Sequence, residues 1–175
     1  MEAVLGSVTG VLAAALLYAA FLSWQGDADI VLQVENAQPR NLTVSDGQAR
    51  FELAVPLFNR GKQDGMVLEF LVRPGFVGQL KGRARIRAGA VWGEDDEGSG
   101  YWRAALLRRR EALPARVFLE VQLHTGDPAR DRLPAALPRI PLAIYFEFVG
   151  RKQIEWRLAE LVLNPSDFVG VGAGT

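Results

Sequence analysis

Beyond Gly26 the apolar residues recur at every second position. Successive side chains of a strand point to opposite faces, so each such row predicts a strand with one buried face. The rows run through Ile30–Val34, Phe51–Leu57, Met66–Val72, Val117–Leu123 and Ile140–Phe148, and they continue with Ile154, Trp156 and Leu158. The segment Ile154–Leu163 also fits a helix, so both interpretations stay open there.

Short polar turns rich in Gly, Asn, Asp and Pro separate these rows. Seven or eight strands joined by such turns predict an antiparallel β-sandwich of the immunoglobulin or fibronectin-III type. No long amphipathic helix alternates with the strands, which argues against a parallel sheet. Pro56 has no N–H to donate, so we expect its strand to lie at a sheet edge or to carry a bulge there.

The N-terminal segment has no charged residue between Ala3 and Gly26. As a helix, Ala3 to Trp24 would span about 33 Å, against about 30 Å of hydrocarbon in a bilayer. A cleaved signal peptide is the alternative, but only Glu2 precedes the run and no basic region does. The pattern therefore predicts a single-pass transmembrane anchor over residues 1–26, a sandwich over 27–169 and a flexible tail over 170–175.

The sequence gives less information on which side of the membrane the domain lies and on whether the helix associates with another helix. The first basic residue is Arg40, and a large domain after a short N-terminal tail favours the extracytoplasmic side. Arg outnumbers Lys 17 to 3, which is typical of GC-rich bacterial genes. A membrane-anchored bacterial domain would belong to the cell envelope. Small residues at Gly6, Gly10 and Ala14 would let another helix approach closely. That helix could belong to a second copy of the chain or to another membrane protein.

The segment from Phe51 to Gly61, followed by Gly65-Met66-Val67-Leu68, resembles a strand–Asn-x-Gly–strand hairpin. Such hairpins occur in immunoglobulin-like adhesion-related domains on bacterial surfaces, and the segment is also similar to the β-sandwich of late-embryogenesis-abundant proteins. It departs from the plant-type pattern, which has a second Asn where this chain has Gly61. The resemblance implies a binding or scaffolding module without catalytic residues.

The composition excludes most kinds of catalytic centre. There is no cysteine, and the single histidine, His124, falls on the polar face at a strand end, where we expect it to be solvent-exposed. No phosphate-binding loop or nucleophile elbow occurs, so the sequence predicts no enzyme, cofactor or metal. The alternative is a membrane-tethered, glycosidase-like hydrolase that uses two carboxylates, with candidates at Glu52, Glu69, Glu120 and Glu147.

Two charged runs remain as candidate binding features in a chain of zero net charge. Glu94–Glu97 could hold calcium, but the run lacks the alternating spacing of calcium loops, so a solvated loop tip is favoured. Lys81, Arg83, Arg85 and Arg87 occupy every second position and would share one strand face. We call these four residues the basic row.

The basic row has two interpretations. It is either an anion-binding surface for phospholipid head groups, acidic glycans or an acidic partner, or a face neutralised by Glu94–Glu97, Glu111 or neighbouring strands. Nucleic acid is disfavoured, because no exposed aromatic residue is interleaved with the cations. The sequence thus predicts a membrane-anchored, non-catalytic binding or scaffold domain, with membrane lipid and a possible membrane-protein partner as its contacts.

Overall fold

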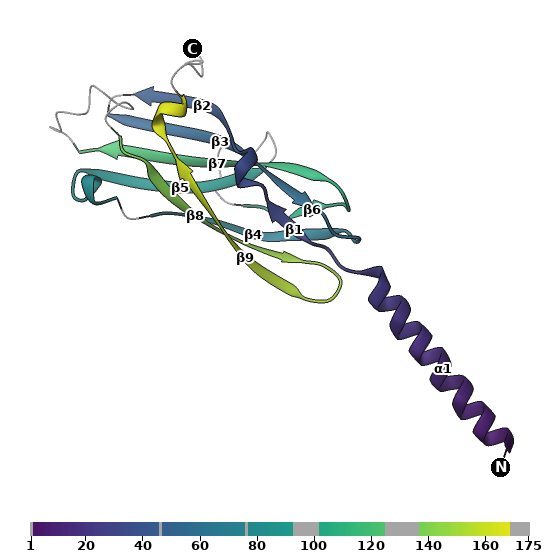
Figure 1. Ribbon diagram of the computed structural model, residues 1–175. Helices are drawn as coiled ribbons and strands as arrows, with labels where there is room; N and C mark the ends of the chain where they lie inside the picture. Colours follow the sequence, from purple (N-terminus) through teal and green to yellow (C-terminus); the bar gives the residue numbers. More distant parts are fainter. Residues whose placement is uncertain (1, 46, 76, 93–101, 125–136, 169–175) are drawn as a thin grey trace.

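The computed structural model describes residues 2–45, 47–75, 77–92, 102–124 and 137–168. Helix α1 (Glu2–Gln25) extends away from a body made of two antiparallel sheets (Figure 1). The helix expected over residues 1–26 therefore forms. Among the described residues, however, no helix reaches the length and apolarity needed to cross a membrane, so the transmembrane part of the prediction has no support here.

The two sheets have the strand order of an immunoglobulin-type sandwich. In the first sheet, sheet A, the order is β1-β3-β7-β5, and β2 pairs with the other half of the β3 edge that β1 uses. In sheet B the order is β6-β4-β8-β9. Sheet A comprises β1 (Ile30–Leu32), β2 (Gln38–Ser45), β3 (Gln48–Asn59), β5 (Ala84–Trp92) and β7 (Ala112–Leu123). Sheet B comprises β4 (Gly65–Pro74), β6 (Ala105–Leu107), β8 (Ile140–Val149) and β9 (Ile154–Leu163).

When β2 and β6 are left out of the count, β1, β3, β7 and β5 are the first, second, fifth and fourth strands. Immunoglobulin domains place the same four strands in one sheet, so this order confirms the predicted antiparallel sandwich. Nine strands lie in the described residues rather than seven or eight. The additional ones are β2, whose residues are mostly polar, and the three-residue β6. Within the described ranges there are also three short 3₁₀ turns: η1 (Val34–Asn36), η2 (Gly78–Leu80) and η4 (Pro165–Phe168).

The core lies between the sheets and follows the predicted alternation in three long strands. Every second residue is buried in β3, in β8 and in β7 from Ala115 onward, including Phe51, Leu119 and Phe146, each at most 1% exposed. Phe168 of η4 closes one side, with its ring centroid 5.1 Å from that of Phe51. Apolar surface removed from water in these rows stabilises the sandwich.

The expectation for Pro56 is wrong, since β3 is an interior strand and its pairing with β7 is regular through Pro56. The reason lies on the opposite edge of β3. There β1 ends at Leu32 and β2 begins at Gln38, so neither pairs with Pro56. The Pro56 carbonyl accepts a hydrogen bond from the Gln33 N–H at 2.9 Å, so it faces the gap between β1 and β2. The N and the C=O of a residue in an antiparallel strand point to the same side. The Pro56 nitrogen therefore also faces this gap, where no strand requires a donor.

Two apolar rows have a different phase from the one predicted. In β4 a register shift between Val67 and Glu69 moves the buried face, so that Val67 is buried and Met66 is exposed. In β9, which is a strand and not a helix, Ile154 and Trp156 point outward and are more than half exposed. The inner side of β9 carries Ala159, Leu161 and Leu163 instead.

The two ends of the sandwich differ in what they carry. Helix α1 joins at the end where the β3–β4, β6–β7 and β8–β9 turns lie, which we call the α1 end. The β2–β3 turn, the β4–β5 connection and the end of β7 lie at the other end, which we call the far end. Residues 93–101, 125–136 and 169–175 lie outside the described part, and with them the Glu94–Glu97 run and the expected tail.

Candidate functional site

The basic row lies at the far end, on the outer face of sheet A. Arg85 and Arg87 are exposed on β5, while Ala84 and Ile86 pack against the core, as the alternation predicts. Lys81 and Arg83 precede the strand in a turn that ends when the His124 N–H donates to the Arg83 carbonyl at 2.9 Å. His124 itself is exposed, as expected.

A polar network lies next to this row. Arg50 on β3 donates to Glu52 and to Glu120, each at 2.9 Å, and its guanidinium carbon lies 4.7 Å from the Phe118 ring centroid. A single half-buried arginine therefore binds both carboxylates, which leaves the three side chains with one net negative charge. Glu120 is also the direct cross-strand neighbour of Arg87, so the neighbouring strands moderate the positive charge of the row.

Between these strands the surface has a hollow of about 190 Å³, lined by Gln48, Arg85, Arg87, Glu120 and Gln122. Within the described residues neither Arg85 nor Arg87 forms an ion pair. Guanidinium groups without partners beside amide side chains suit the binding of carboxylate or phosphate. The proposed neutralising run Glu94–Glu97 lies outside the described part of the chain, so that alternative stays a prediction.

The α1 end is built around Asn59, a polar side chain that is completely buried. Its Nδ2 donates to the carbonyls of Gln63 at 2.8 Å and Leu107 at 3.2 Å. Its Oδ1 accepts from the N–H groups of Gly61 at 3.0 Å and Asp29 at 3.2 Å. One side chain therefore ties the β3–β4 turn, the end of β6 and the segment that follows α1 into one unit, with each of its four hydrogen-bonding positions used.

Asp27 fixes the same segment to the β8–β9 turn. Its carboxylate accepts from the backbone N–H groups of Ala28 at 2.8 Å, Arg151 at 2.6 Å and Lys152 at 2.9 Å. Burial raises the pKa of Asp27, but these three hydrogen bonds and the nearby Lys152 charge outweigh it and hold the pKa below its usual value. The ionised carboxylate is thus the form that closes the turn.

Asp29 adds a second set of links. It pairs with Arg60 and with Arg157, the latter at 2.7 Å, and Arg157 also donates to the Ile30 carbonyl at 2.8 Å. Burial raises the pKa of Asp29, and the hydrogen bonds from Arg60 and Arg157 lower it further than burial raises it. The ion pairs of Asp29 and the hydrogen bond from Arg157 therefore connect the start of β1, the β3–β4 turn and β9.

Helix α1 is held by this junction rather than by a free linker. The Lys62 ammonium lies 5.8 Å from the Trp24 ring centroid and donates to the Trp24 carbonyl at 3.4 Å. Arg151 donates to the Gln25 side chain. Contacts from two separate turns therefore reach the last residues of the helix.

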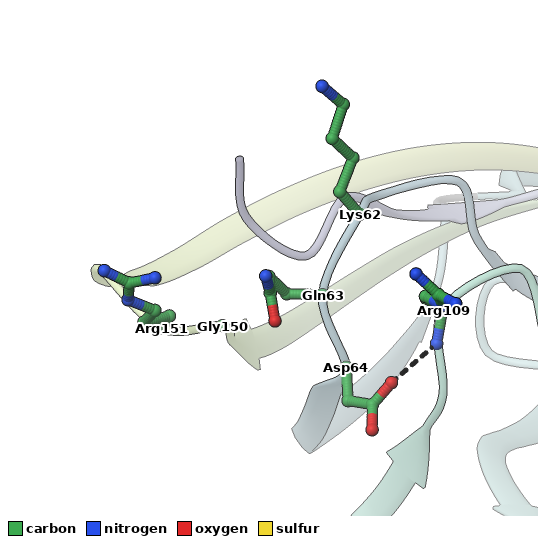
Figure 2. A pocket seen from close by; sticks show the side chains of 6 residues that line it. All are labelled: Lys62, Gln63, Asp64, Arg109, Gly150 and Arg151. Atoms are coloured by element: carbon green, nitrogen blue, oxygen red, sulfur yellow. Dashed lines mark hydrogen bonds between the residues drawn. The ribbon is translucent and has the colours of Figure 1, made fainter. Parts of the chain in front are cut away.

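An open hollow of about 560 Å³ lies beside the junction, lined by Lys62, Gln63, Asp64, Arg109, Gly150 and Arg151. Figure 2 shows its cationic side chains coming from three different turns, with the Arg109 N–H donating to Asp64 at 2.8 Å. The turns at this end carry more basic than acidic residues. The basic ones are Arg60, Lys62, Arg108, Arg109, Arg110, Arg151 and Lys152, and the acidic ones are Asp64 and Glu111.

The outer face of sheet B has a different character, which the sequence reasoning did not anticipate. Among the described residues outside α1, every large hydrophobic side chain that is more than half exposed belongs to this sheet: Leu106, Ile154, Trp156, Leu158 and Val162. We call the outward side chains of the sheet the sheet-B face. They are Leu106, Met66, Glu69, Leu71, Arg73, Pro141, Ala143, Tyr145, Glu147, Val149, Ile154, Trp156, Leu158, Glu160 and Val162.

The acidic candidates for catalysis form two adjacent pairs, and of the four only Glu120 lines one of the hollows described above. Glu52 and Glu120 are bound to Arg50, as described above. Glu69 and Glu147 are cross-strand neighbours on the sheet-B face, where Glu69 is exposed and Glu147 half-buried. In the part of the chain that the structure describes, no group of three or more acidic or histidine residues could hold a metal ion.

The glycines proposed for helix association lie in α1. Around Gly10 nothing lies within 4 Å of the position that a Cβ would take, and Ala14 is exposed. Gly6 lies in the first two turns of the helix. At Gly10 and Ala14 the surface is open to another helix, and association through Gly6, Gly10 and Ala14 stays a prediction.

Comparisons with known proteins give no family. No family model matches the chain, and neither does any curated protein. Among solved structures it is similar to the GAE domain of GGA2p from Saccharomyces cerevisiae, with a TM-score of 0.37 and 6% identity over 79% of this chain and 98% of that one. It is also similar to the structure titled yeast GGA1_GAE domain-P21, with a TM-score of 0.33 and 9% identity over 74% of this chain and 99% of that one. At these scores neither likeness assigns a function.

Proposed function

We propose that this chain is a membrane-attached, non-catalytic binding domain that serves as an accessory part of a membrane or cell-envelope assembly. The observation that carries the proposal is an apolar helix with exposed side chains that is fixed to the sandwich by a buried polar junction. Val11, Leu16 and Leu17 of α1 are each more than 70% exposed. Each such side chain gains about 1.5–3 kcal/mol when it leaves water, so the isolated helix is poorly suited to an aqueous environment.

The α1 end supports attachment in a second way. The junction of Asn59, Asp27 and Asp29 keeps the turns beside the helix, so their basic side chains would lie at the level of the lipid head groups. Each Lys or Arg near an anionic membrane surface contributes about 1 kcal/mol of attraction. We propose membrane lipid as a partner on these grounds. The basic turns do not support either side of the membrane, and for the domain we keep the extracytoplasmic side that the sequence analysis expects.

The basic row has a different role in this proposal. Arg85 pairs in register with Gln122, ten residues from the α1-end residue Ala112 of β7, which corresponds to about 33 Å along the strand. Lys81 and Arg83 lie further still in the same direction. The row is therefore directed away from the membrane of its own helix, and we propose that it binds an acidic soluble ligand or partner.

The hydrolase alternative is less favoured by the same geometry. A pair of catalytic carboxylates needs a substrate cleft between them. Glu69 and Glu147 lie on an open sheet face, and Glu52 and Glu120 are occupied by Arg50. These positions support binding rather than bond cleavage.

Vesicle flotation of the full chain tests the attachment. We expect the wild-type chain to float with phosphatidylcholine vesicles and more completely when phosphatidylglycerol is included. Changing Leu12 and Leu16 to Lys should abolish flotation, because both side chains are strongly exposed on α1. Changing the exposed Gln38 and Gln122 of the sandwich to Lys adds the same charge and should have no effect. Equal flotation of both double variants would refute the proposed attachment.

A further inference from the structure

We propose that the sheet-B face docks one amphipathic helix of a partner protein, and that this helix presents an arginine to Glu69, Glu147 and Trp156. The inference names the partner chemistry of the proposed binding function. It rests on that binding role, and the attachment of α1 to a bilayer enters only in the argument against a second copy of the chain.

The two outer faces of the same sandwich provide the first argument. At the far end of sheet A the outward residues are polar or charged, and its one aromatic ring there, Phe118, is covered by Arg50. On sheet B the apolar side chains are left open, with Trp156 57% and Leu158 54% exposed. Contiguous exposed apolar residues edged by polar ones mark sites of interaction with other proteins. Of these two regions, only the sheet-B face therefore combines strongly exposed apolar side chains with polar neighbours.

An unrelieved pair of acidic residues provides the second argument. Glu69 and Glu147 are direct cross-strand neighbours, and neither forms an ion pair with any residue in the described ranges. Like charges directly opposite one another destabilise a sheet. Arg73, two strand rows away, lies instead over the Tyr145 ring, 5.7 Å from its centroid. A cation supplied from outside would relieve this repulsion.

The neighbours of the pair favour arginine over lysine. Glu147 is itself opposite Trp156 on β9, so the three side chains form one row across β4, β8 and β9. A planar guanidinium can donate to both carboxylates and stack on the indole, whereas an ammonium group provides only a point charge. The next row, of Leu71, Tyr145 and Leu158, provides apolar contact beside it.

The size of the face fits a single helix. Strands β4, β8 and β9 have 10 residues each, which gives a face about 33 Å long and about 14 Å wide. An α-helix of about 20 residues is about 30 Å long and about 10 Å wide. A helix aligned with the strands would cover the apolar side chains of β8 and β9 along their whole length.

A second copy of the chain does not suit this face. Two copies packed face to face would bring their Glu69–Glu147 pairs toward one another and increase the repulsion. Antiparallel pairing of two β9 edges would place the two α1 ends on opposite sides, since α1 leaves from one end of the sandwich (Figure 1). That arrangement cannot place both helices in the same bilayer.

The test uses the full chain in detergent and three labelled 20-residue helical peptides. The peptides share a leucine stripe and differ at one central stripe position, which is Arg, Gln or Glu. We expect the Arg peptide to bind wild type about tenfold more tightly than the Gln peptide, because charge-assisted hydrogen bonds are the stronger kind. The Glu peptide should bind most weakly. All three peptides also bind to the detergent micelles to a similar extent. The affinities are therefore compared only between peptides and between protein variants in the same detergent.

Three double variants distinguish the proposed site from nonspecific adhesion of the peptides. Glu69→Gln with Glu147→Gln should remove the tenfold preference, while Glu35→Gln with Asp167→Asn removes the same charge elsewhere and should preserve it. Trp156→Ser with Leu158→Thr should abolish binding without lowering the unfolding midpoint, because both side chains are already exposed. The proposal would be overturned if wild type showed no preference for the Arg peptide, or if the preference survived the Glu69 and Glu147 changes. Neither result would affect the vesicle flotation that tests membrane attachment. A dimer in sedimentation that the Trp156 and Leu158 changes dissociate would overturn it in favour of a second copy.

Discussion

Replacement of Asn59 by Ala removes the side chain that holds the α1 end together. The change deletes four hydrogen bonds, to the Gln63 and Leu107 carbonyls and from the Gly61 and Asp29 N–H groups, all of which converge on a residue with 0% exposure. A neutral intramolecular hydrogen bond contributes about 1 kcal/mol net, and a buried group left without a partner costs about 1–3 kcal/mol. Partial rehydration at this edge of the core offsets some of that loss.

We therefore expect Asn59→Ala to lower the free energy of unfolding by about 3–4 kcal/mol, a large share of the roughly 5–15 kcal/mol typical of a domain. For a chain of this length the loss corresponds to a fall of about 10 °C in the unfolding midpoint. Urea unfolding followed by circular dichroism measures it, and the slope with denaturant should stay unchanged because the same surface is exposed.

Asn36→Ala provides the matched control. The Asn36 side chain is exposed and makes one hydrogen bond, to Gln33 at 3.3 Å. Its loss should cost less than about 0.5 kcal/mol, as is usual for surface substitutions. If Asn59→Ala costs less than about 1 kcal/mol, or no more than the control, then Asn59 does not organise the junction and the rigid connection of α1 to the sandwich has no basis.

Three further predictions follow from the other charged and small residues. The lowered pKa of Asp27 means that its contribution to stability is present above its unfolded pKa of about 3.9 and is lost as pH falls through its folded pKa, so Asp27→Asn should flatten the loss of stability below about pH 4. Changing the three arginines of the basic row to Gln should weaken binding of polyglutamate at 50 mM salt and have little effect at 500 mM, where charges are screened; unchanged binding at low salt would make the row a solvated strand face. Changing Gly6 and Gly10 to Ile should lower the yield of dimer or complex in detergent if the helix associates through its small residues, and an unchanged yield would exclude that contact.

Alternation was sufficient to predict the sandwich because β3, β7 and β8 each have one apolar and one more polar side. Strand β9 has apolar residues on both sides, with Leu161 inward and Leu158 outward. A period of two therefore could not show which side of β9 faces the core. The mixed pattern of β9 is also the one signal of the sheet-B face that the sequence contains. A strand that is apolar on both sides has either two buried faces or an exposed contact surface.

The junction was not predictable from local patterns. The sequence identifies Asn59-Arg60-Gly61 as a turn, and Asp27 as a residue that follows an apolar run and belongs in water. The structure instead pairs Asp27 with backbone groups of Arg151 and Lys152, more than 120 residues away. Such contacts depend on which turns the sheet order brings to one end, and single-chain periodicity contains no information on that order.

The attachment of the chain to a membrane through α1, with the sandwich held close to the surface, is tested most directly by the depth of single spin labels in proteoliposomes. The chain has no cysteine, so one cysteine at a time can be introduced without background. We choose Leu16 on α1, Lys152 at the α1 end and Gln122 at the far end, all exposed. The account predicts that the Leu16 label is reached by oxygen and shielded from a water-soluble nickel complex, that the Lys152 label lies at head-group level, and that the Gln122 label is fully accessible from water. A Leu16 label as accessible to the nickel complex as the Gln122 label would contradict it.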